Sequence, residues 1–256
     1  MDIEAFITIH DQELLYHLEN HDGGKYKKIF NNIKYTYLFV GKGDIDMIKS
    51  YDNVIICRDL EYNIEQYKYL VDFTAWYCIV KNKLNKYNNL ILLQYDTNLT
   101  EDFIKKTIDN KKENNIISYC NTTIYNENFW YNDGISIIRK YLNTKNIKLE
   151  KLVFDYILES NDDKWITTNN ICCDISFLNW FVNDVEKILI KNGNFIHIGH
   201  SFERIIYIYS ILNSFNIKYI DNILEHYQLN SHNTQNLIVD FDKHNLIINK
   251  FNNDSL

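Results

Sequence analysis

The chain contains no proline among its 256 residues and only seven glycines. Proline normally makes up about 5% of residues, so the usual punctuation between elements is missing, and boundaries must be inferred from Gly and Asn clusters. Asn, Ile, Lys and Tyr are heavily used instead. Because all four have A/T-rich codons, this bias indicates genome base composition rather than a structural device.

The cysteine content gives no support for a disulfide framework or a zinc site. The five cysteines are odd in number and form no CxxC pair, which predicts reduced, mostly buried thiols in a cytosolic protein. No apolar run approaches the ~18 residues that a membrane span needs, and no signal-peptide pattern opens the chain. The net charge is -7 and no dense basic stripe is present, so nucleic acid is not an expected partner.

The most informative stretch is residues 88–97 (NNLILLQYDT). Its four consecutive apolar residues, 90–93, predict a short strand buried on both faces, as in parallel sheets. Asp96 follows the end of this strand, where ligands bind in open α/β sheets. A carboxylate there is a candidate ligand for a divalent cation that holds a diphosphate. The alternative is that Asp96 caps a turn after a core strand.

Strand-like and helix-like patterns alternate along the chain, which predicts one α/β domain with a mostly parallel sheet flanked by helices. Asp72 falls within a helix that is apolar nearly all round, so its carboxyl must find partners or line a cavity. Asp174 and Ser201 are expected to cap two later helices. Strands are expected at 5–10, 34–41, 54–57, 90–93, 116–120, 195–198, 237–239 and 246–248, a strand-and-loop element at 165–173, and helices at 11–19, 64–85, 100–114, 135–142, 149–160, 175–189 and 202–215.

Polar residues gather where the predicted strands end. His10 follows the first strand, Gly41 and Asp44 follow the second, and Asp96 follows the central one. This arrangement suits nucleotide binding. The chain has no GxGxxG motif, no Walker A loop and no GxSxG elbow, so the dinucleotide, P-loop and α/β-hydrolase classes lack their fingerprints.

Two further segments are residues 72–82 (DFTAWYCIVKN) and residues 91–96 (ILLQYD). They resemble the donor-site region of GT-A glycosyltransferases, above all those of large DNA viruses and some bacterial polysaccharide loci. In that family a helix carrying an Asp that touches the donor sugar precedes a strand ending in a DxD metal motif. The resemblance gives the first role to Asp72 and places Gln94, Tyr95 and Asp96 at the motif. Gln94 replaces the first acid, so only Asp96 is left there as a direct metal ligand.

Later segments extend the resemblance to residue 232. Residues 165–170 (WITTNN) resemble the acceptor-side loop, which implies acceptor contacts for Thr168 and Asn169. Residues 199–204 (GHSFER) resemble the family's H-x-x-E-R helix start, which implies an acceptor-side role for His200. Residues 226–232 (HYQLNSH) resemble the segment that returns a His to the metal, which implies His226 or His232 as a further ligand.

The resemblance implies a GT-A-like, Rossmann-like fold and the transfer of a hexosyl or deoxyhexosyl group. The donor would be a nucleotide sugar, UDP-linked in preference, the acceptor a glycan hydroxyl and the cofactor Mn²⁺ or Mg²⁺. Transfer needs a neutralised diphosphate, an aligned acceptor and, in inverting enzymes, a base. Glu203 is the expected base, with Asp174 as second choice. The expected donor-binding residues are Thr8, His10, Gly41, Asp44, Asp72, Tyr95 and Arg204.

The same resemblance divides the single domain into a nucleotide-binding half at about 1–120, an acceptor-side half at about 121–235 and a polar extension at 236–256. It places the protein in the cytoplasm, or the host cytoplasm if the chain is viral. Two other interpretations stay open. One is a non-catalytic nucleotide- or sugar-binding protein with this fold. The other is a scaffold whose acids are caps and ion pairs.

Overall fold

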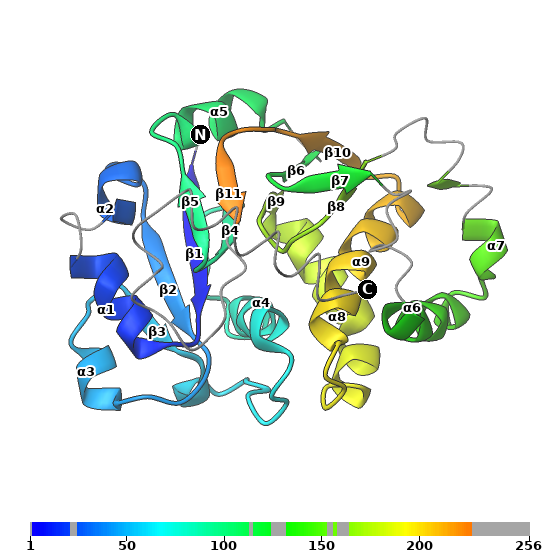
Figure 1. Ribbon diagram of the computed structural model, residues 1–256, viewed down its shortest axis with the longest axis horizontal. Helices are drawn as coiled ribbons and strands as arrows, with labels where there is room; N and C mark the ends of the chain where they lie inside the picture. Colours follow the sequence, from blue (N-terminus) through cyan, green and yellow to red (C-terminus); the bar gives the residue numbers. More distant parts are fainter. Residues whose placement is uncertain are drawn as a thin grey trace, which may run out of the picture.

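The computed structural model describes residues 2–20, 25–112, 115–123, 132–152, 156–157 and 164–226. Its centre is a seven-stranded sheet in the order β10-β6-β9-β4-β1-β2-β3 (Figure 1). Strand β9 runs antiparallel to both of its neighbours, and the other adjacent pairs are parallel. The expected α/β fold with a mixed, mostly parallel sheet is therefore confirmed. The strands are β1 (Ile3–Ile9), β2 (Tyr35–Phe39), β3 (Val54–Ile56), β4 (Asn89–Gln94), β6 (Asn115–Ser118), β9 (Ile171–Asp174) and β10 (Asn216–Tyr219).

Helices cover both faces of this sheet, each over its own apolar cluster. One face carries α1 (Gln12–Asn20), α2 (Lys25–Ile29), α3 (Ile45–Lys49) and α5 (Phe103–Asn110). The other carries α4 (Val71–Lys81), α6 (Asn132–Thr144), α7 (Leu149–Leu152), α8 (Ile175–Lys191) and α9 (Ile198–Leu212).

Strand β4 shows why the central stretch is so apolar. Leu90 and Leu92 belong to the cluster on the α4 face, and Ile91 and Leu93 belong to the cluster on the α1 face. Successive side chains of a strand point to opposite faces, so a strand between two helical layers needs apolar residues at every position. The predicted burial on both faces is confirmed.

Two small antiparallel sheets lie beside the main one. β7 (Asn121–Thr123) pairs with β8 (Lys164–Ile166), and β5 (Thr97–Leu99) pairs with β11 (Leu224–His226). The second pairing places the backbone of His226 opposite Thr97, the residue after Asp96. A late part of the chain thus returns to the end of β4.

Three predictions about element boundaries were wrong. The helix expected at 64–85 is shorter, because turns occupy its first residues and Lys83 adopts a positive φ of 51° just after it ends. The strand expected at 195–198 is a turn that leads into α9. Because α9 begins at Ile198, Ser201 lies inside the helix, and His197 occupies the cap position.

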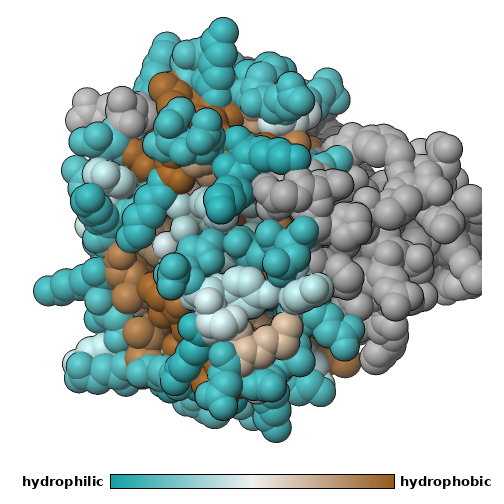
Figure 2. Space-filling model, turned by 90° about the vertical axis from the view of Figure 1, so that its left-hand side faces the viewer, coloured by the Kyte–Doolittle hydropathy of each residue, from teal (hydrophilic) through white to brown (hydrophobic). Residues whose placement is uncertain are grey.

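The polar loop at 21–24 and the strands predicted at 237–239 and 246–248 lie outside the described residues. Within the described residues, no helix is long and apolar enough to cross a membrane. Figure 2 shows the side of the molecule at the left of Figure 1, where most of the described surface is hydrophilic and hydrophobic areas are small and separate.

Candidate functional site

The order in which the chain adds strands to the sheet reverses between β1 and β4. From β1 the chain continues to β2 on one side, and it later returns through α4 to β4 on the other side of β1. In open α/β sheets the crevice at such a switch point is where ligands bind. His10 follows β1 here, and Tyr95 and Asp96 follow β4. In Figure 1 this edge is the lower end of β1, and α4 lies beside it.

Three side chains from separate segments meet at this edge. Asp72, in the first turn of α4, accepts two hydrogen bonds through Oδ2, one from Gln94 Nε2 and one from Asn169 Nδ2, each at 2.9 Å. Gln94 ends β4, and Asn169 lies in the turn between β8 and β9. We call these three residues the Asp72 cluster. The expectation that Asp72 must find partners is confirmed.

Asn170 and Thr168 hold the β8–β9 turn against the end of β4. Asn170 Oδ1 accepts from the backbone N–H of Gln94 at 2.7 Å, and its Nδ2 donates to Gln94 Oε1 at 3.3 Å. The same Nδ2 donates to Thr168 Oγ1 at 3.0 Å. Both amide groups of Gln94 are therefore fixed, which orients the Nε2 that binds Asp72.

The pKa of Asp72 is raised, chiefly because its carboxyl is buried. The nearby charge of Asp96 adds to the rise, while the hydrogen bonds from Gln94 and Asn169 and the nearness of His10 oppose it. Oδ1 of Asp72 makes no hydrogen bond with any described residue. Perturbed acids in clefts are typical of functional sites, so this oxygen is a candidate ligand contact.

His10 and Tyr95 lie side by side above the ends of β1 and β4. Their rings meet edge to face, with centroids 4.8 Å apart. Nδ1 of His10 is buried and has no hydrogen-bond partner among the described residues. Thr8, the other residue of β1 predicted to bind the donor, is 4% exposed, and its carbonyl accepts from the N–H of Tyr95. Thr8 thus supports the edge, and His10 presents a polar atom there.

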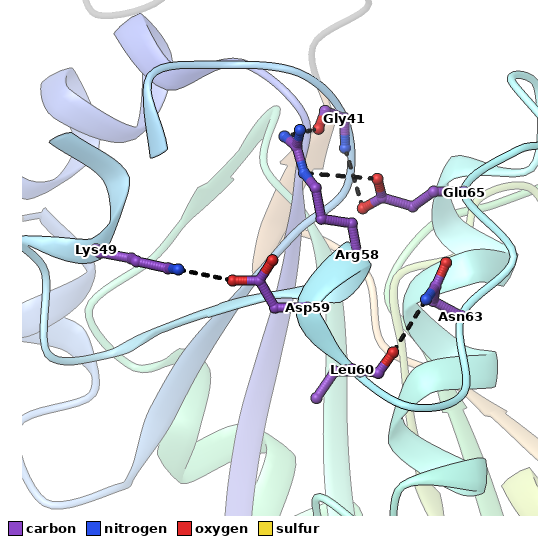
Figure 3. A network of polar contacts seen from close by, with 7 residues as sticks. All are labelled: Gly41, Lys49, Arg58, Asp59, Leu60, Asn63 and Glu65. Carbon is purple, nitrogen blue, oxygen red and sulfur yellow. Dashed lines mark hydrogen bonds and ion pairs between the residues drawn. The ribbon is translucent and has the colours of Figure 1, made fainter. Parts of the chain in front are cut away.

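The neighbouring strand ends carry a second polar group (Figure 3). Gly41 has a φ of 140°, which only glycine adopts readily, and an added Cβ would lie 3.1 Å from the carbonyl oxygen of His10. Its N–H donates to Glu65 Oε1 at 3.4 Å, and its carbonyl accepts from Arg58. Arg58 Nε also lies 3.9 Å from Glu65 Oε2. The pKa of Glu65 is raised, chiefly by burial, with Gly41 and Arg58 opposing the rise.

Asp44, which was expected to bind the donor, stabilises a helix. It caps α3, and its Oδ1 accepts from the N–H groups of Asp46 and Met47 at 3.1 and 3.2 Å. An N-cap acid stabilises a helix in this way without any ligand.

Asp96 and Glu203 come from distant segments but lie near the same thiol. Burial raises the pKa of Cys120 to about 12, a hydrogen bond with Thr168 opposes the rise, and the charges of Asp96 and Glu203 add to it. Asp96 is 8% exposed in the turn after β4, and Glu203 on α9 is half-buried. Asp96 and Glu203 are thus both within electrostatic range of Cys120.

Arg204 packs inside the protein. It is 5% exposed, its Nη1 donates to the carbonyl of His200 at 2.6 Å, and its guanidinium lies over the ring of Trp165 at 5.1 Å. The expectation that Glu203 and Arg204 lie in the first turn of their helix was wrong, since α9 begins at Ile198. We therefore do not assign the diphosphate to Arg204.

Asp174 is not brought to this site. It pairs in register with Asn89, the first residue of β4, so it lies at the opposite edge of the sheet from Asp96. Its Oδ2 accepts from the buried Lys111 Nζ at 3.0 Å. It occupies the cap position of α8, but its side chain makes no capping hydrogen bond. The role that the structure shows for Asp174 is therefore its ion pair with Lys111.

Within the described residues, no three His, Cys, Asp or Glu side chains gather to hold a metal ion. Of the three predicted ligands, Asp96 has a described side chain, His226 is described only as part of β11, and His232 lies outside the described residues. One carboxylate alone does not make a site for Mn²⁺ or Mg²⁺. We therefore derive no chemical step through a metal.

Sequence reasoning missed the parts played by Gln94 and Asn170. Gln94 was noted only as a departure from a metal motif, and Asn170 as part of a loop. A buried carboxyl needs hydrogen-bond donors. The expected burial of Asp72 and the amide of Gln94 at a strand end could therefore have suggested that the two residues bind each other. Nothing else in the sequence indicates which donors reach Asp72.

No protein-family model and no curated protein matches this chain. Solved structures with a similar fold include the apo form of the bifunctional glycosyltransferase WbbM, with a TM-score of 0.48 and 12% identity over 91% of this chain and 48% of that one. This chain thus spans about half the length of that protein. The mannosyltransferase Ktr4p from S. cerevisiae, also solved in complex with GDP, has a TM-score of 0.42 and 14% identity over 88% of this chain and 70% of that one.

Proposed function

We propose that this protein is a glycosyltransferase that moves a sugar from a nucleoside-diphosphate donor, UDP-linked in preference, to a glycan hydroxyl. The observation that carries the proposal is the Asp72 cluster at the switch point between β1 and β4, beside Asp96. Fixed carboxyl and amide groups suit the hydroxyls of a sugar, and the crevice beyond the strand ends suits a nucleotide.

The nucleotide in this proposal lies along the carboxyl edge, from the Gly41 and Glu65 group past His10 to Tyr95. The aromatic pair of His10 and Tyr95 offers it a packing surface, and the backbone of Gly41 permits close approach. The donor sugar then lies next to the Asp72 cluster. This arrangement uses the donor contacts expected for His10, Gly41, Tyr95 and Asp72.

The chemical step breaks the bond between the anomeric carbon and the diphosphate oxygen, which leaves with the electron pair. The acceptor oxygen forms the new bond to that carbon, and its proton passes to Glu203. A positioned carboxylate of this kind contributes about 10²–10⁴-fold to such a step. Mn²⁺ or Mg²⁺ held by Asp96 with His226 or His232 would neutralise charge on the leaving diphosphate, and the step above does not depend on it.

A second candidate is a nucleotide- or sugar-binding protein without catalysis. Gln94 favours it, because this residue stands where the family's metal motif has an acid and uses its amide to hold Asp72. Two measurements on the intact chain separate the candidates. We expect UDP with Mn²⁺ to raise the melting temperature more than either does alone, and UDP-sugars to be hydrolysed slowly without acceptor. Stabilisation without hydrolysis or transfer would favour the binding protein, and no stabilisation by any nucleotide would favour the scaffold.

A further inference from the structure

A cleft of about 260 Å³ opens between the beginnings of α4 and α9. Its lining comes from the segments around 68–73 and 196–202 and includes Asp72, which Gln94 at the end of β4 also contacts. We call it the α4–α9 cleft. The residues of its lining that matter here are Tyr69, Val71, Asp72, Ile196, Gly199 and His200.

Asp72 connects this cleft to the donor edge. Its Oδ2 is held by Gln94 and Asn169, while Oδ1 makes no hydrogen bond with a described residue. A carboxylate oxygen fixed in this way accepts a hydrogen bond from an O–H or N–H group that enters the cleft. A ligand with hydroxyl groups therefore meets an acceptor that is already oriented.

The rest of the lining is mainly apolar. Ile196 is 62% exposed at the rim, and Tyr69 and Val71 are half-buried. A sugar ring combines hydroxyls at its edge with an apolar face of C–H groups, which matches one acid and several apolar side chains. The volume lies below the roughly 300–1,000 Å³ of pockets for drug-sized ligands, so the cleft accommodates a single ring.

Glu203 lies next along the same helix face. Gly199 lines the cleft, and residues four apart in a helix are neighbours on one face, so Glu203 lies one turn after Gly199 on the same face of α9. We propose that the α4–α9 cleft binds the terminal pyranoside unit of the acceptor. Asp72 Oδ1 accepts a hydrogen bond from one of its hydroxyls, and a second hydroxyl is directed to Glu203. This inference rests on the proposed transfer reaction.

Gly199→Leu tests the assignment with little risk to the fold. The nearest atom to an added Cβ would be the carbonyl oxygen of Tyr69 at 3.9 Å, an ordinary van der Waals distance, so the first side-chain carbon meets no clash, and leucine is a better helix former than glycine. The matched control is Lys187→Leu, at an exposed position of α8. The probes are the methyl glycosides of glucose, galactose, mannose and N-acetylglucosamine, studied with UDP present.

In saturation-transfer NMR, we expect at least one methyl glycoside to bind the wild type and the control, and to lose its signal with Gly199→Leu. In transfer assays the leucine should raise the KM for that acceptor about 10–200-fold, the size of effect of steric changes in an apolar pocket. Hydrolysis of the donor without acceptor should stay within about twofold of wild type, since the donor lies at the strand ends.

The outcomes separate this inference from the proposed function. A wild type that binds no nucleotide and hydrolyses no nucleotide sugar would overturn both. With donor hydrolysis present, equal glycoside binding by wild type and Gly199→Leu would overturn the cleft assignment alone. Loss of donor hydrolysis in Gly199→Leu would indicate that the cleft binds the donor sugar instead of the acceptor. Failure of all four glycosides to bind the wild type would overturn the assigned class of acceptor.

Discussion

Gln94 donates a hydrogen bond from Nε2 to Oδ2 of Asp72 at 2.9 Å. Gln94 therefore holds the buried carboxyl of Asp72 in place. A carboxylate at position 94 would bring a second negative charge to hydrogen-bond distance of a buried acid, and like charges so close cannot both ionise easily. The amide at position 94 and the burial of Asp72 are thus two aspects of one arrangement.

Gln94→Glu should lower the free energy of unfolding by about 1–3 kcal/mol at neutral pH, because Asp72 loses a donor and gains a repulsive neighbour. Gln66→Glu, the same change at an exposed position, is the control and should have little effect. Chemical denaturation at pH 7 measures both. Equal stability of wild type and Gln94→Glu would show that the hydrogen bond at Asp72 contributes nothing.

Asp72 also predicts a pH dependence of stability. Its pKa is raised in the folded state. Such an acid holds its proton more tightly when folded, so its contribution is present below the unfolded pKa of about 3.9 and is lost as pH rises through the folded pKa. Asp72→Asn keeps an oxygen for Gln94 and Asn169 but cannot ionise. The melting temperature of Asp72→Asn should therefore rise relative to that of the wild type as pH increases above about 4, and parallel curves would contradict the raised pKa.

Hydrophobic patterning predicted most of the fold, because the two-faced burial of residues 90–93 and the alternation of strands with helices follow from the sequence alone. The predicted boundaries of helices and strands were wrong where no proline or capping residue marks them. The start of α9 at Ile198 is an example, since Ser201 looks like a cap yet lies one turn inside the helix. Patterning also cannot reveal tertiary pairings, so the ion pair of Lys111 with Asp174 could not be foreseen.

The location of Asp174 supplies a contrast with Glu203. Glu203→Gln should reduce turnover by about 10²–10⁴-fold with donor affinity nearly unchanged, because size and polarity are kept while the base is removed. Asp174→Asn should leave turnover unchanged but destabilise the fold by roughly 1–3 kcal/mol, since the buried Lys111 loses its ionic partner. Steady-state kinetics and melting curves of the two variants distinguish a catalytic acid from a structural one. Near-normal turnover of Glu203→Gln would remove the base from the mechanism or indicate a retaining one.

The proposed metal would be bound at the end of β4. Asp96 lies in the turn after β4, and the β5–β11 pairing places the backbone of His226 opposite Thr97. If the two residues share a cation that holds the diphosphate, Asp96→Asn and His226→Ala should each abolish the extra stabilisation that Mn²⁺ gives with UDP. UDP alone should still bind. At about 100 times its dissociation constant, UDP with Mn²⁺ should stabilise the wild type by about 2.7 kcal/mol.

His197→Ala is the control for His226→Ala, because His197 occupies the cap position of α9 and no metal role is proposed for it, so the synergy should stay intact. Asp96→Asn keeps the size of the side chain in a turn outside the strand, so the variant should fold. A variant that melts far below wild type without any ligand would make Asp96 a structural cap. Equal stabilisation by UDP in the presence of EDTA and of Mn²⁺ would remove the metal from the mechanism. Protein donors would then have to neutralise the diphosphate at the carboxyl edge, and Arg58, which donates to the carbonyl of Gly41, would be a cation to test.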